Sequence, residues 1–509
     1  MSESKKNVSF LGLGTSVTVN VGDNLLDIIR TENIPINADC GGIGRCGKCR
    51  VLVNGKKRLA CRTHVVEDIE VQLVADKEGD KDYAILLDYD GPAGVPGGAL
   101  ASAAEGAASP TKLAIAVDIG TTTVVGKLLD LSTGSELGSF ALLNSQLPFG
   151  ADVISRINAS LDDSSELCGL ITTQIDAAVA GLLKDTGLDA AKVEHVVIAG
   201  NTTMSYILLG LPCRSLGFVP FEPAHYYPLI TPYPELFKTN TLSCDCVVLP
   251  FISAYVGGDL TSGLCTLSDE DDFILMDMGT NGELIFKRGE RLICTATAAG
   301  PAFEGGNIEC GSGSTRGAIS WVAYDNGAYQ IKTIGAGAAT GICGSGILDL
   351  MAILVREGLI DETGYMSDAI ENSRIVLARN PELDGDGEVF FTQKDVRQFQ
   401  LAKSAVRTGL EIIMEEMGGD PPSKVFLAGG FGQNLDPNSA LMTGLLPAEF
   451  AGRVRSIGNS SLSGAVKVCL SSEARASVEK LAEDGQEINL AAHRLFNDLF
   501  MNHMSFEIP

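Results

Sequence analysis

Four cysteines in a glycine-rich stretch constrain this chain more than any other feature. Cys40, Cys46, Cys49 and Cys61 have the spacing C-x5-C-x2-C-x11-C, within DCGGIGRCGKCRVLVNGKKRLAC. Thiolates hold iron–sulfur clusters, and the loop must wrap closely enough for backbone N–H groups to reach the cluster sulfurs. Glycine allows such wrapping because it has no Cβ atom to crowd the backbone, and four glycines lie between the first three of these thiols: Gly41, Gly42, Gly44 and Gly47. The pattern predicts a [2Fe–2S] cluster.

Two other interpretations of the cysteines stay open at this point. A structural zinc site usually presents two Cys-x2-Cys pairs, and only one such pair, Cys46 and Cys49, occurs in this stretch. Buried, unreactive cysteines are the second alternative, but they do not explain three thiols within ten residues of a glycine-rich loop. The iron–sulfur interpretation accounts for both the spacing and the glycines.

The segments around the cysteines predict a small mixed domain. VSFLGLG and SVTVNV are expected to form a hairpin, NLLDIIRTEN a helix, and CRVLVNGKKRLAC a second hairpin with Asn54 and Gly55 in its turn. Residues 1–78 resemble a ferredoxin-type [2Fe–2S] domain of the β-grasp kind. The first gap is one residue longer than the plant-type spacing, and the last gap is short. The resemblance implies transfer of single electrons.

Composition limits the class of protein. A chain of 509 residues exceeds what one core usually supports, and its 45% hydrophobic residues are typical of folded domains. Lys and Arg total 38 against 64 Asp and Glu, for a net charge of −26. Such a charge repels phosphate backbones, so we expect no nucleic-acid partner. No signal peptide and no run of about 18 apolar residues is recognised, so we expect a cytoplasmic protein without a membrane partner.

Changes in composition and hydrophobic pattern along the chain predict the domain organisation. Residues 90–111 contain mainly Gly, Ala, Ser and Pro, which favours a flexible linker; an ordered Ala-rich helical connector is the alternative. From residue 112 onward, apolar strand-like runs alternate with helical patterns, which is typical of the α/β class. We expect a ferredoxin-like domain at 1–78, a linker at 79–111, and two lobes at 112–270 and 271–509.

A matched pair of short motifs stands out in this second part. AVDIGTTT at 116–123 and LMDMGTNG at 275–282 both place Asp-x-Gly-Thr after an apolar strand. A tight turn there would aim backbone N–H groups and threonine hydroxyls at a phosphate, while the aspartate holds Mg²⁺ through water. Each motif alone is more often an Asp-capped turn. Two of them facing each other across a cleft would clamp the phosphates of a nucleotide.

This pair, with the sequence AGGFG at 428–432, resembles the ATPase fold of actin, sugar kinases and seventy-kilodalton chaperones, which is a two-lobed, ribonuclease-H-like architecture. The resemblance implies phosphate loops at 118–122 and 277–280, an adenosine loop at 428–432, and a connecting loop at 199–203. The second loop, DMGTNGE, departs from the more usual Asp-x-Gly-Gly-Gly-Thr, which implies altered γ-phosphate contacts and slow hydrolysis. The expected nucleotide-binding residues are Gly120, Thr121, Thr122, Asn201, Gly279, Thr280, Asn281, Gly429 and Gly430.

Four acidic residues are the candidates for catalysis. Asp118 and Asp277 are expected to act on Mg-ATP, with turn capping as the alternative role. Glu283 and Glu304 lie in or beside glycine-rich loops and are candidates for orienting water. Asn201 has the simpler alternative of capping a helix.

Further strings extend the resemblance over essentially the whole chain: NSQLPFGADVISRI (144–157), AGNTTM (199–204), ATAAGPAFEGGNIECG (296–311) and GICGSGILDL (341–350). Together with the order ferredoxin, linker, ATPase fold, they resemble the reductive activators of corrinoid proteins. That family implies ATP-dependent one-electron reduction of Co(II) to Co(I) corrinoid for methyl transfer or demethylation. It implies [2Fe–2S], ATP and Mg²⁺ as cofactors, and as partners the corrinoid protein of a methyltransferase system and a low-potential electron donor. A homodimer is expected.

Three other functions remain as alternatives. One is an ATP-driven electron injector for another low-potential enzyme; such proteins resemble the ATPase half but lack a ferredoxin domain. A small-molecule kinase is the second, although it would leave the redox domain without a purpose. The third is a degenerate ATPase fold that serves as a binding module for the ferredoxin.

Overall fold

A computed structural model describes the protein at residues 5–11, 15–32, 34, 36, 49–73, 110–150, 152–161, 163–219, 221–223, 229–279, 282–325, 327–380 and 387–507. Cys40, Cys46, Thr280 and Asn281 lie outside these residues, as does nearly all of the expected linker at 79–111.

The N-terminal part is a five-stranded sheet with one helix. Its strands have the order β2-β1-β5-β3-β4, and its helix α1 spans Leu25–Thr31. Both predicted hairpins and the predicted helix are confirmed. Asn54 and Gly55 have φ angles of 50° and 76°, which suit the two central positions of a hairpin turn. The strands are β1 (Lys5–Phe10), β2 (Thr15–Asn20), β3 (Arg50–Val53), β4 (Lys56–Leu59) and β5 (Ile69–Leu73).

The first lobe is built on a six-stranded mixed sheet in the order β10-β11-β9-β6-β7-β8. Its central strands are nearly continuous apolar runs, because helices cover both of its faces. The strands are β6 (Leu113–Ile119), β7 (Thr123–Asp130), β8 (Glu136–Leu143), β9 (Val193–Gly200), β10 (Leu229–Pro232) and β11 (Asp245–Val248). The helices of this region are α2 (Val153–Ser160), α3 (Ser165–Thr186), α4 (Thr202–Leu208), α5 (Arg214–Gly217) and α6 (Tyr233–Phe237).

The second lobe repeats this plan with the order β21-β20-β12-β13-β14-β22. These strands are β12 (Asp272–Met278), β13 (Gly282–Arg288), β14 (Arg291–Thr297), β20 (Lys424–Ala428), β21 (Val454–Gly458) and β22 (Gln486–Glu487). Two smaller sheets accompany it: β15 (Ala318–Asp325), β16 (Ala328–Thr333) and β17 (Gly341–Ile342), then β18 (Arg374–Arg379) and β19 (Glu388–Thr392). Its other helices are α8 (Gly344–Arg356), α9 (Gln393–Glu416), α10 (Gly429–Asn434), α11 (Pro437–Met442) and α14 (Phe496–Asn502).

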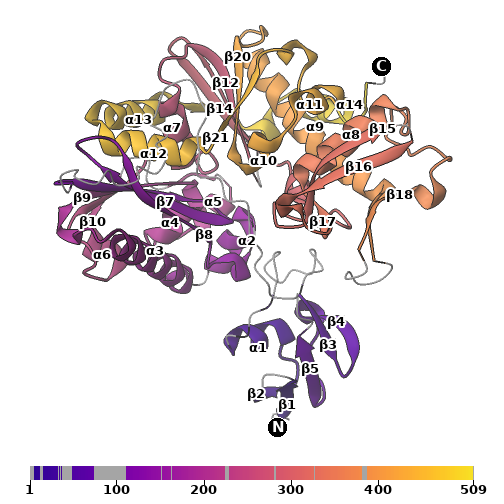
Figure 1. The fold of residues 1–509 in the computed structure, drawn as a ribbon, viewed down its shortest axis with the longest axis horizontal. Helices are drawn as coiled ribbons and strands as arrows, with labels where there is room; N and C mark the ends of the chain where they lie inside the picture. Colours follow the sequence, from indigo (N-terminus) through magenta and orange to yellow (C-terminus); the bar gives the residue numbers. More distant parts are fainter. Residues whose placement is uncertain are drawn as a thin grey trace.

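Two helices cross between the sheets and join the lobes (Figure 1). Helix α12 (Ser460–Leu470) comes late in the chain yet packs on the first sheet, whereas α7 (Gly258–Thr266) packs on the second. With α13 (Ser472–Asp484), they form the layer between the lobes. Small residues allow α7 and α12 a close approach, and the Ser262 hydroxyl donates to the Ser461 carbonyl at 2.7 Å.

Substituting Gly464 tests this crossing. A Cβ atom at Gly464 would lie 1.9 Å from the Ser262 carbonyl oxygen, so Gly464→Ala must push the helices apart. We expect it to lower the free energy of unfolding by about 2 kcal/mol, as overpacking does. Gly181→Ala on α3 is the matched control, since a Cβ there meets nothing within 4 Å; helix propensity alone predicts stabilisation by up to about 1 kcal/mol. Urea unfolding of both variants measures the difference, and equal effects would contradict the prediction.

One helix within the described ranges, α3, is long and apolar enough to cross a membrane by length and composition. Its apolar side chains Leu167, Ile171, Ile175 and Val179 are buried in the core beneath the first sheet. Packing in this core therefore accounts for its apolar character.

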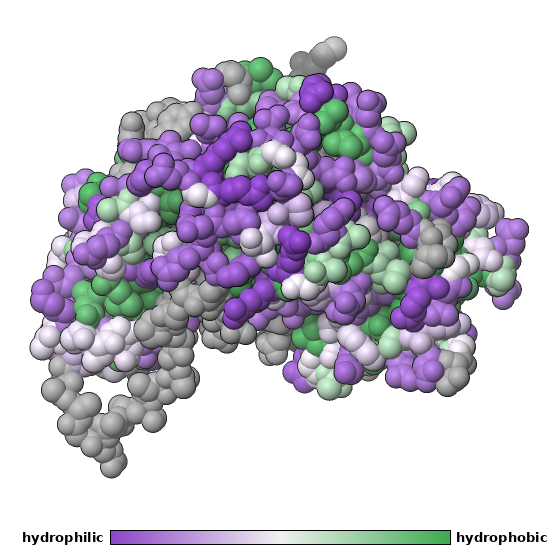
Figure 2. All heavy atoms as spheres, turned by 90° about the horizontal axis from the view of Figure 1, so that it is seen from above, coloured by the Kyte–Doolittle hydropathy of each residue, from purple (hydrophilic) through white to green (hydrophobic). Residues whose placement is uncertain are grey.

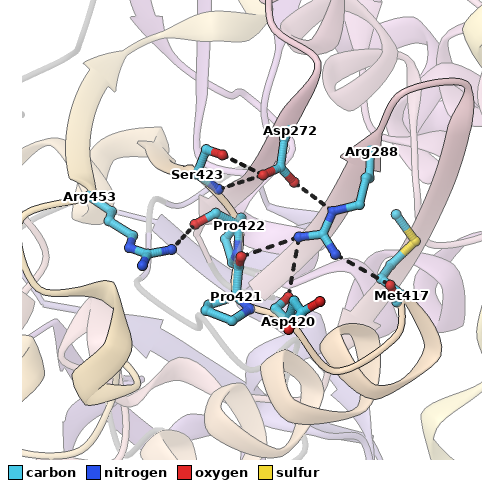
Figure 3. A network of polar contacts seen from close by, with 8 residues as sticks. All are labelled: Asp272, Arg288, Met417, Asp420, Pro421, Pro422, Ser423 and Arg453. Atoms are coloured by element: carbon cyan, nitrogen blue, oxygen red, sulfur yellow. Dashed lines mark hydrogen bonds and ion pairs between the residues drawn. The ribbon is translucent and has the colours of Figure 1, made fainter.

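A polar network fixes the turn that follows α9 (Figure 3). Arg288 Nε donates to Asp272 Oδ1 at 2.8 Å, and Ser423 N donates to Asp272 Oδ2 at 2.9 Å. The guanidinium of Arg288 also reaches the Pro421 carbonyl at 3.2 Å. The network ties the start of β12 to the approach of β20, so the two strands enter the sheet in a fixed register.

Figure 2 shows one face of the molecule, which is mostly hydrophilic with small, separate hydrophobic patches. This distribution agrees with the excess of 64 acidic over 38 basic side chains.

Candidate nucleotide and cluster sites

Two predicted aspartates lie near the carboxyl ends of central strands, Asp118 on β6 and Asp277 on β12. The Asp118 carboxylate accepts hydrogen bonds from Ser461 Oγ at 2.7 Å and Asn459 Nδ2 at 3.1 Å, both at the start of α12. The start of α12 thus contacts the first Asp-x-Gly-Thr motif, although more than 340 residues separate the two in sequence. Burial raises the pKa of Asp118 despite these two bonds.

A third carboxylate joins them, that of Asp259 at the start of α7. Burial, followed by the charges of Asp277 and Asp118, raises the pKa of Asp259 to about 8. Burial and the charge of Asp118 raise the pKa of Asp277 to about 7. Three buried carboxylates repel one another whenever they are ionised, and a bound cation would relieve this repulsion and favour the ionised forms.

The geometry fits a hydrated cation better than a naked one. In the part of the chain that the structure describes, no three His, Cys, Asp or Glu side chains converge as direct ligands of one metal ion. Mg²⁺ dehydrates reluctantly and usually keeps several waters, with its remaining contacts to one or two carboxylates and to substrate phosphates. Asp118, Asp259 and Asp277 would therefore hold Mg²⁺ largely through its water shell and leave room for the phosphates of ATP.

Two buried polar side chains that were not identified from the sequence bind the backbone of the expected first phosphate loop, and a third binds one of these two. Asn144 Nδ2 donates to the Gly120 carbonyl at 2.9 Å, and Arg156 Nη2 donates to the Thr121 carbonyl at 2.8 Å. Gln146 in turn accepts from Arg156 Nη1 at 2.8 Å. A trans peptide points its C=O and its N–H in opposite directions. Binding these carbonyls from one side therefore turns the next N–H groups toward the other side, where a phosphate would lie.

Asn201 caps a helix and also contacts the expected first phosphate loop. Its side chain caps α4 by accepting from Met204 N at 2.9 Å, so the capping role is confirmed. Its Nδ2 also donates to Thr121 Oγ1 at 3.1 Å, which brings it to the first phosphate loop.

The expected adenosine loop at 428–432 packs against the second aspartate. Gly429 has φ = +80°, and a Cβ there would lie 2.4 Å from Asp277 Oδ1. Gly279 and Gly430 have open space at this position, with nothing within 4 Å. Glycine at 429 is therefore needed for the position of the carboxylate, whereas Gly279 and Gly430 leave the backbone accessible.

Gly429→Ala should weaken Mg-ATP binding at least tenfold, because the new methyl group displaces the Asp277 carboxylate. Gly452→Ala is the matched control: Gly452 has φ = +75°, and a Cβ there meets nothing within 4 Å. Both variants carry the strain of a left-handed alanine, about 1 kcal/mol, but only Gly429→Ala touches the site. Titration calorimetry measures the affinities, and an equal loss in both variants would refute the steric argument.

The two glutamates lie on different sides of the site. Glu283 on β13 is directly opposite Asp277 in the antiparallel pair, so both side chains share one face of the sheet. Glu304 ends η4 (Pro301–Glu304), where the neighbouring Phe303 ring stacks on Phe431 of the adenosine loop at 4.7 Å. The structure therefore places Glu283 on the same sheet face as Asp277, and Glu304 next to a residue that packs on the 428–432 loop.

The N-terminal sheet brings two of the four candidate cluster ligands together. Cys49 precedes β3, Cys61 lies in η1 (Ala60–Arg62) after β4, and their sulfur atoms are 3.2 Å apart. Neither forms a disulfide bond. The turn at Asn54 and Gly55 returns the chain so that the two thiols meet at one end of the hairpin. Two thiols at this separation fit the donor set of an iron–sulfur cluster.

Asp259, Asn459 and Ser461 were also missed from the sequence, and a signal for the last two exists. Gly458-Asn459-Ser460-Ser461 repeats the pattern of Gly200-Asn201-Thr202-Thr203, a strand followed by Gly-Asn and two hydroxyl residues. Both asparagines cap the following helix. This second internal repeat places both caps against the expected first phosphate loop, Asn201 at Thr121 and Asn459 at Asp118.

Family profiles match nearly the whole chain. A 2Fe-2S iron-sulfur cluster binding domain matches residues 9–69, the RACo middle region matches 113–269, and the C-terminal domain of RACo, described as the ASKHA domain, matches 271–508. The predicted fold, a ferredoxin domain followed by an actin-like and sugar-kinase-like ATPase fold, is confirmed. The profiles also agree with a [2Fe–2S] cluster and with ATP as cofactors.

Named relatives agree with these profiles. The corrinoid activation enzyme RamQ of Eubacterium limosum is 33% identical over 422 residues, 77% of this chain and 70% of that protein. The Co(II) methylated amine-specific corrinoid protein reductase of Methanosarcina barkeri is 23% identical over 434 residues, 77% of this chain and 76% of that protein. A solved reductive activator for corrinoid, iron-sulfur protein superposes with a TM-score of 0.68 at 27% identity, over 98% of both chains. The chain belongs to the family of reductive activators of corrinoid proteins.

Proposed function

We propose that this chain reduces the Co(II) corrinoid of a partner protein to Co(I) with one electron, and that Mg-ATP bound between the lobes drives the step. The activity is that of the family. The observation that carries the ATP role is the group of Asp118, Asp259 and Asp277, buried together between two lobes that α7 and α12 connect. The partner is the corrinoid protein of a methyltransferase system, and the reductant is a low-potential one-electron donor.

The chain's own residues have separate tasks. Cys49 and Cys61, with Cys40 and Cys46, would hold the [2Fe–2S] cluster, which supplies one-electron transfer. Asp118, Asp259 and Asp277 hold the hydrated Mg²⁺, and the N–H groups of Thr121 and Thr122 bind phosphate. Gly279, Thr280 and Asn281 complete the second phosphate loop, and Gly429 and Gly430 accept the adenosine. Glu283 shares a sheet face with Asp277 and is the residue that we assign to orienting water.

ATP is needed because Co(I) is a low-potential state and a [2Fe–2S] cluster is a comparatively mild reductant. A ligand shifts an equilibrium only by its differential affinity for the two states. Closure of the two lobes on Mg-ATP would therefore favour the conformation that binds the partner for electron transfer. The division into 1–78, 79–111, 112–270 and 271–509, a homodimer and a cytoplasmic location belong to the same proposal.

Anaerobic visible spectroscopy tests the function. Co(II) corrinoid protein is mixed with this protein, a low-potential donor and Mg-ATP, and the spectrum of Co(I) is followed. Conversion only in the presence of ATP supports the proposal. Conversion without ATP, or none with several corrinoid proteins despite an intact cluster and bound ATP, would contradict it.

A further inference from the structure

The ferredoxin domain contacts the first lobe through its helix α1, on the side toward α2 (Figure 1). Arg30 Nη2 donates a hydrogen bond to the Pro148 carbonyl at 2.5 Å, and the guanidinium lies over the Phe149 ring, 5.9 Å from its centroid. Asp27, one turn earlier on α1, is 4.0 Å from Arg30 Nη1. The contact requires an arginine, because a planar guanidinium can donate to a carbonyl and cover an aromatic ring at the same time.

Pro148 and Phe149 belong to η2 (Leu147–Phe149), a single turn between Gln146 and Gly150. Arg156 binds both of these flanking residues: its Nε donates to the Gly150 carbonyl and its Nη1 to Gln146 Oε1. The turn that receives Arg30 is therefore fixed at both ends by a single buried arginine.

The same arginine holds the first phosphate loop through the Thr121 carbonyl. Arg156 is fully buried, and the hydrogen bonds that the structure describes for it go to carbonyl, amide and thioether groups. Burial lowers its pKa to about 10, so it stays charged at neutral pH. A buried charge that loses its acceptors is costly, so the acceptors on η2 and on the phosphate loop must move together with it.

We propose that the segment 144–156 couples occupancy of the first phosphate loop to docking of the ferredoxin domain on η2, with Arg156 as the positioning residue that links them. The inference rests on the proposed function, because it assumes that ATP binds at this loop. Thermodynamic coupling is reciprocal. If bound ATP changes how η2 receives Arg30, then removing Arg30 must change the affinity for ATP by the same factor.

The first experiment measures this reciprocity in the full-length, cluster-containing protein. Anaerobic titration calorimetry gives the affinity for a non-hydrolysable ATP analogue with Mg²⁺ in the wild type, in Arg30→Ala and in Lys5→Ala. Lys5 is an exposed basic residue on β1 of the same domain and serves as the matched control. We expect Arg30→Ala to change the affinity about 5- to 10-fold, at the lower end of the usual range for coupled sites, and Lys5→Ala to leave it unchanged.

The second experiment tests whether the coupling passes through Arg156. Arg156→Lys keeps the charge but lacks the planar fork that reaches several carbonyls. In that background, Arg30→Ala should have no further effect on affinity, a non-additivity that a purely structural role of Arg156 would not produce. Gln146→Leu, which removes the bond to Arg156 Nη1 together with the bond from Gln146 Nε2 to the Leu167 carbonyl, replaces it if Arg156→Lys does not fold. If Arg30→Ala still changes the affinity by its full factor in either background, Arg156 does not carry the coupling.

The outcomes separate the two proposals. A wild-type protein that does not bind the analogue overturns both the ATP role and the coupling. Equal affinity in the wild type and Arg30→Ala overturns only the coupling. A change in Lys5→Ala as large as that in Arg30→Ala also overturns it, because the cause would then be the charge of the domain and not the contact with η2.

Discussion

Asp277→Asn and Asp259→Asn should each make the nucleotide-free protein more stable while they abolish tight binding of Mg-ATP. Burial and mutual repulsion raise the pKa of Asp277 to about 7 and that of Asp259 to about 8. A neutral amide of the same shape removes both costs, and it also removes the charge that attracts Mg²⁺. We expect a loss of at least 100-fold in affinity for Mg-ATP and a rise in Tm without nucleotide.

The raised pKa values also predict how the stability of the nucleotide-free protein changes with pH. The unfolded carboxyls ionise near their ordinary value of 3.8, whereas the folded ones keep their protons until pH 7 to 8. Between these limits the unfolded state binds fewer protons, so the free energy of unfolding falls as the pH rises. Each pKa unit corresponds to about 1.4 kcal/mol. The Tm of the nucleotide-free wild type should therefore fall from pH 5 to pH 8. Asp259→Asn should make the Tm less dependent on pH.

Asp349→Asn separates burial from magnesium binding. Burial also raises the pKa of Asp349, to about 6, but its carboxylate accepts from Ser439 Oγ and Val322 N and belongs to the packing of α8. We expect this variant to alter the pH dependence of stability without changing the affinity for Mg-ATP. A loss of Mg-ATP affinity in Asp349→Asn equal to that in Asp277→Asn would show that the effect is indirect.

Local sequence patterns predicted most of the fold because they act over short distances. The apolar runs ending at Asp118 and Asp277 became central strands, since a strand buried on both faces needs apolar residues throughout. Asn54 and Gly55 formed the predicted turn because both readily adopt positive φ. The paired Asp-x-Gly-Thr motifs also identified two of the three carboxylates.

Long-range packing decided what the sequence did not reveal. Ser461 meets Asp118 only because α12 returns from the second lobe to the first sheet. Arg156 has the pattern of a polar residue on a short helix, and only the folded chain shows that its guanidinium is buried against the Thr121 carbonyl. Neither contact has a short-range signature, because each depends on which elements lie side by side.

The second prediction with a large effect concerns the electron-transfer domain. Cys61→Ala should abolish the visible absorption of the cluster and the conversion of Co(II) to Co(I), because the sulfur that lies 3.2 Å from Cys49 Sγ is lost. Cys168→Ala is the matched control: Cys168 lies on α3, and its thiol donates only to the Leu208 carbonyl, far from the ferredoxin domain in sequence. It should retain the cluster and the activity.

Binding of Mg-ATP decides how a loss in Cys61→Ala is interpreted. The carboxylates proposed to attract Mg²⁺ lie on β6, β12 and α7, none of which belongs to the ferredoxin sheet. Cys61→Ala should therefore still bind Mg-ATP although it transfers no electron, which places the defect in the redox domain and not in the fold as a whole. A variant with the full cluster spectrum and full reduction of Co(II) would show that Cys61 is not a ligand, and the cluster would then need a fourth ligand from elsewhere in the chain.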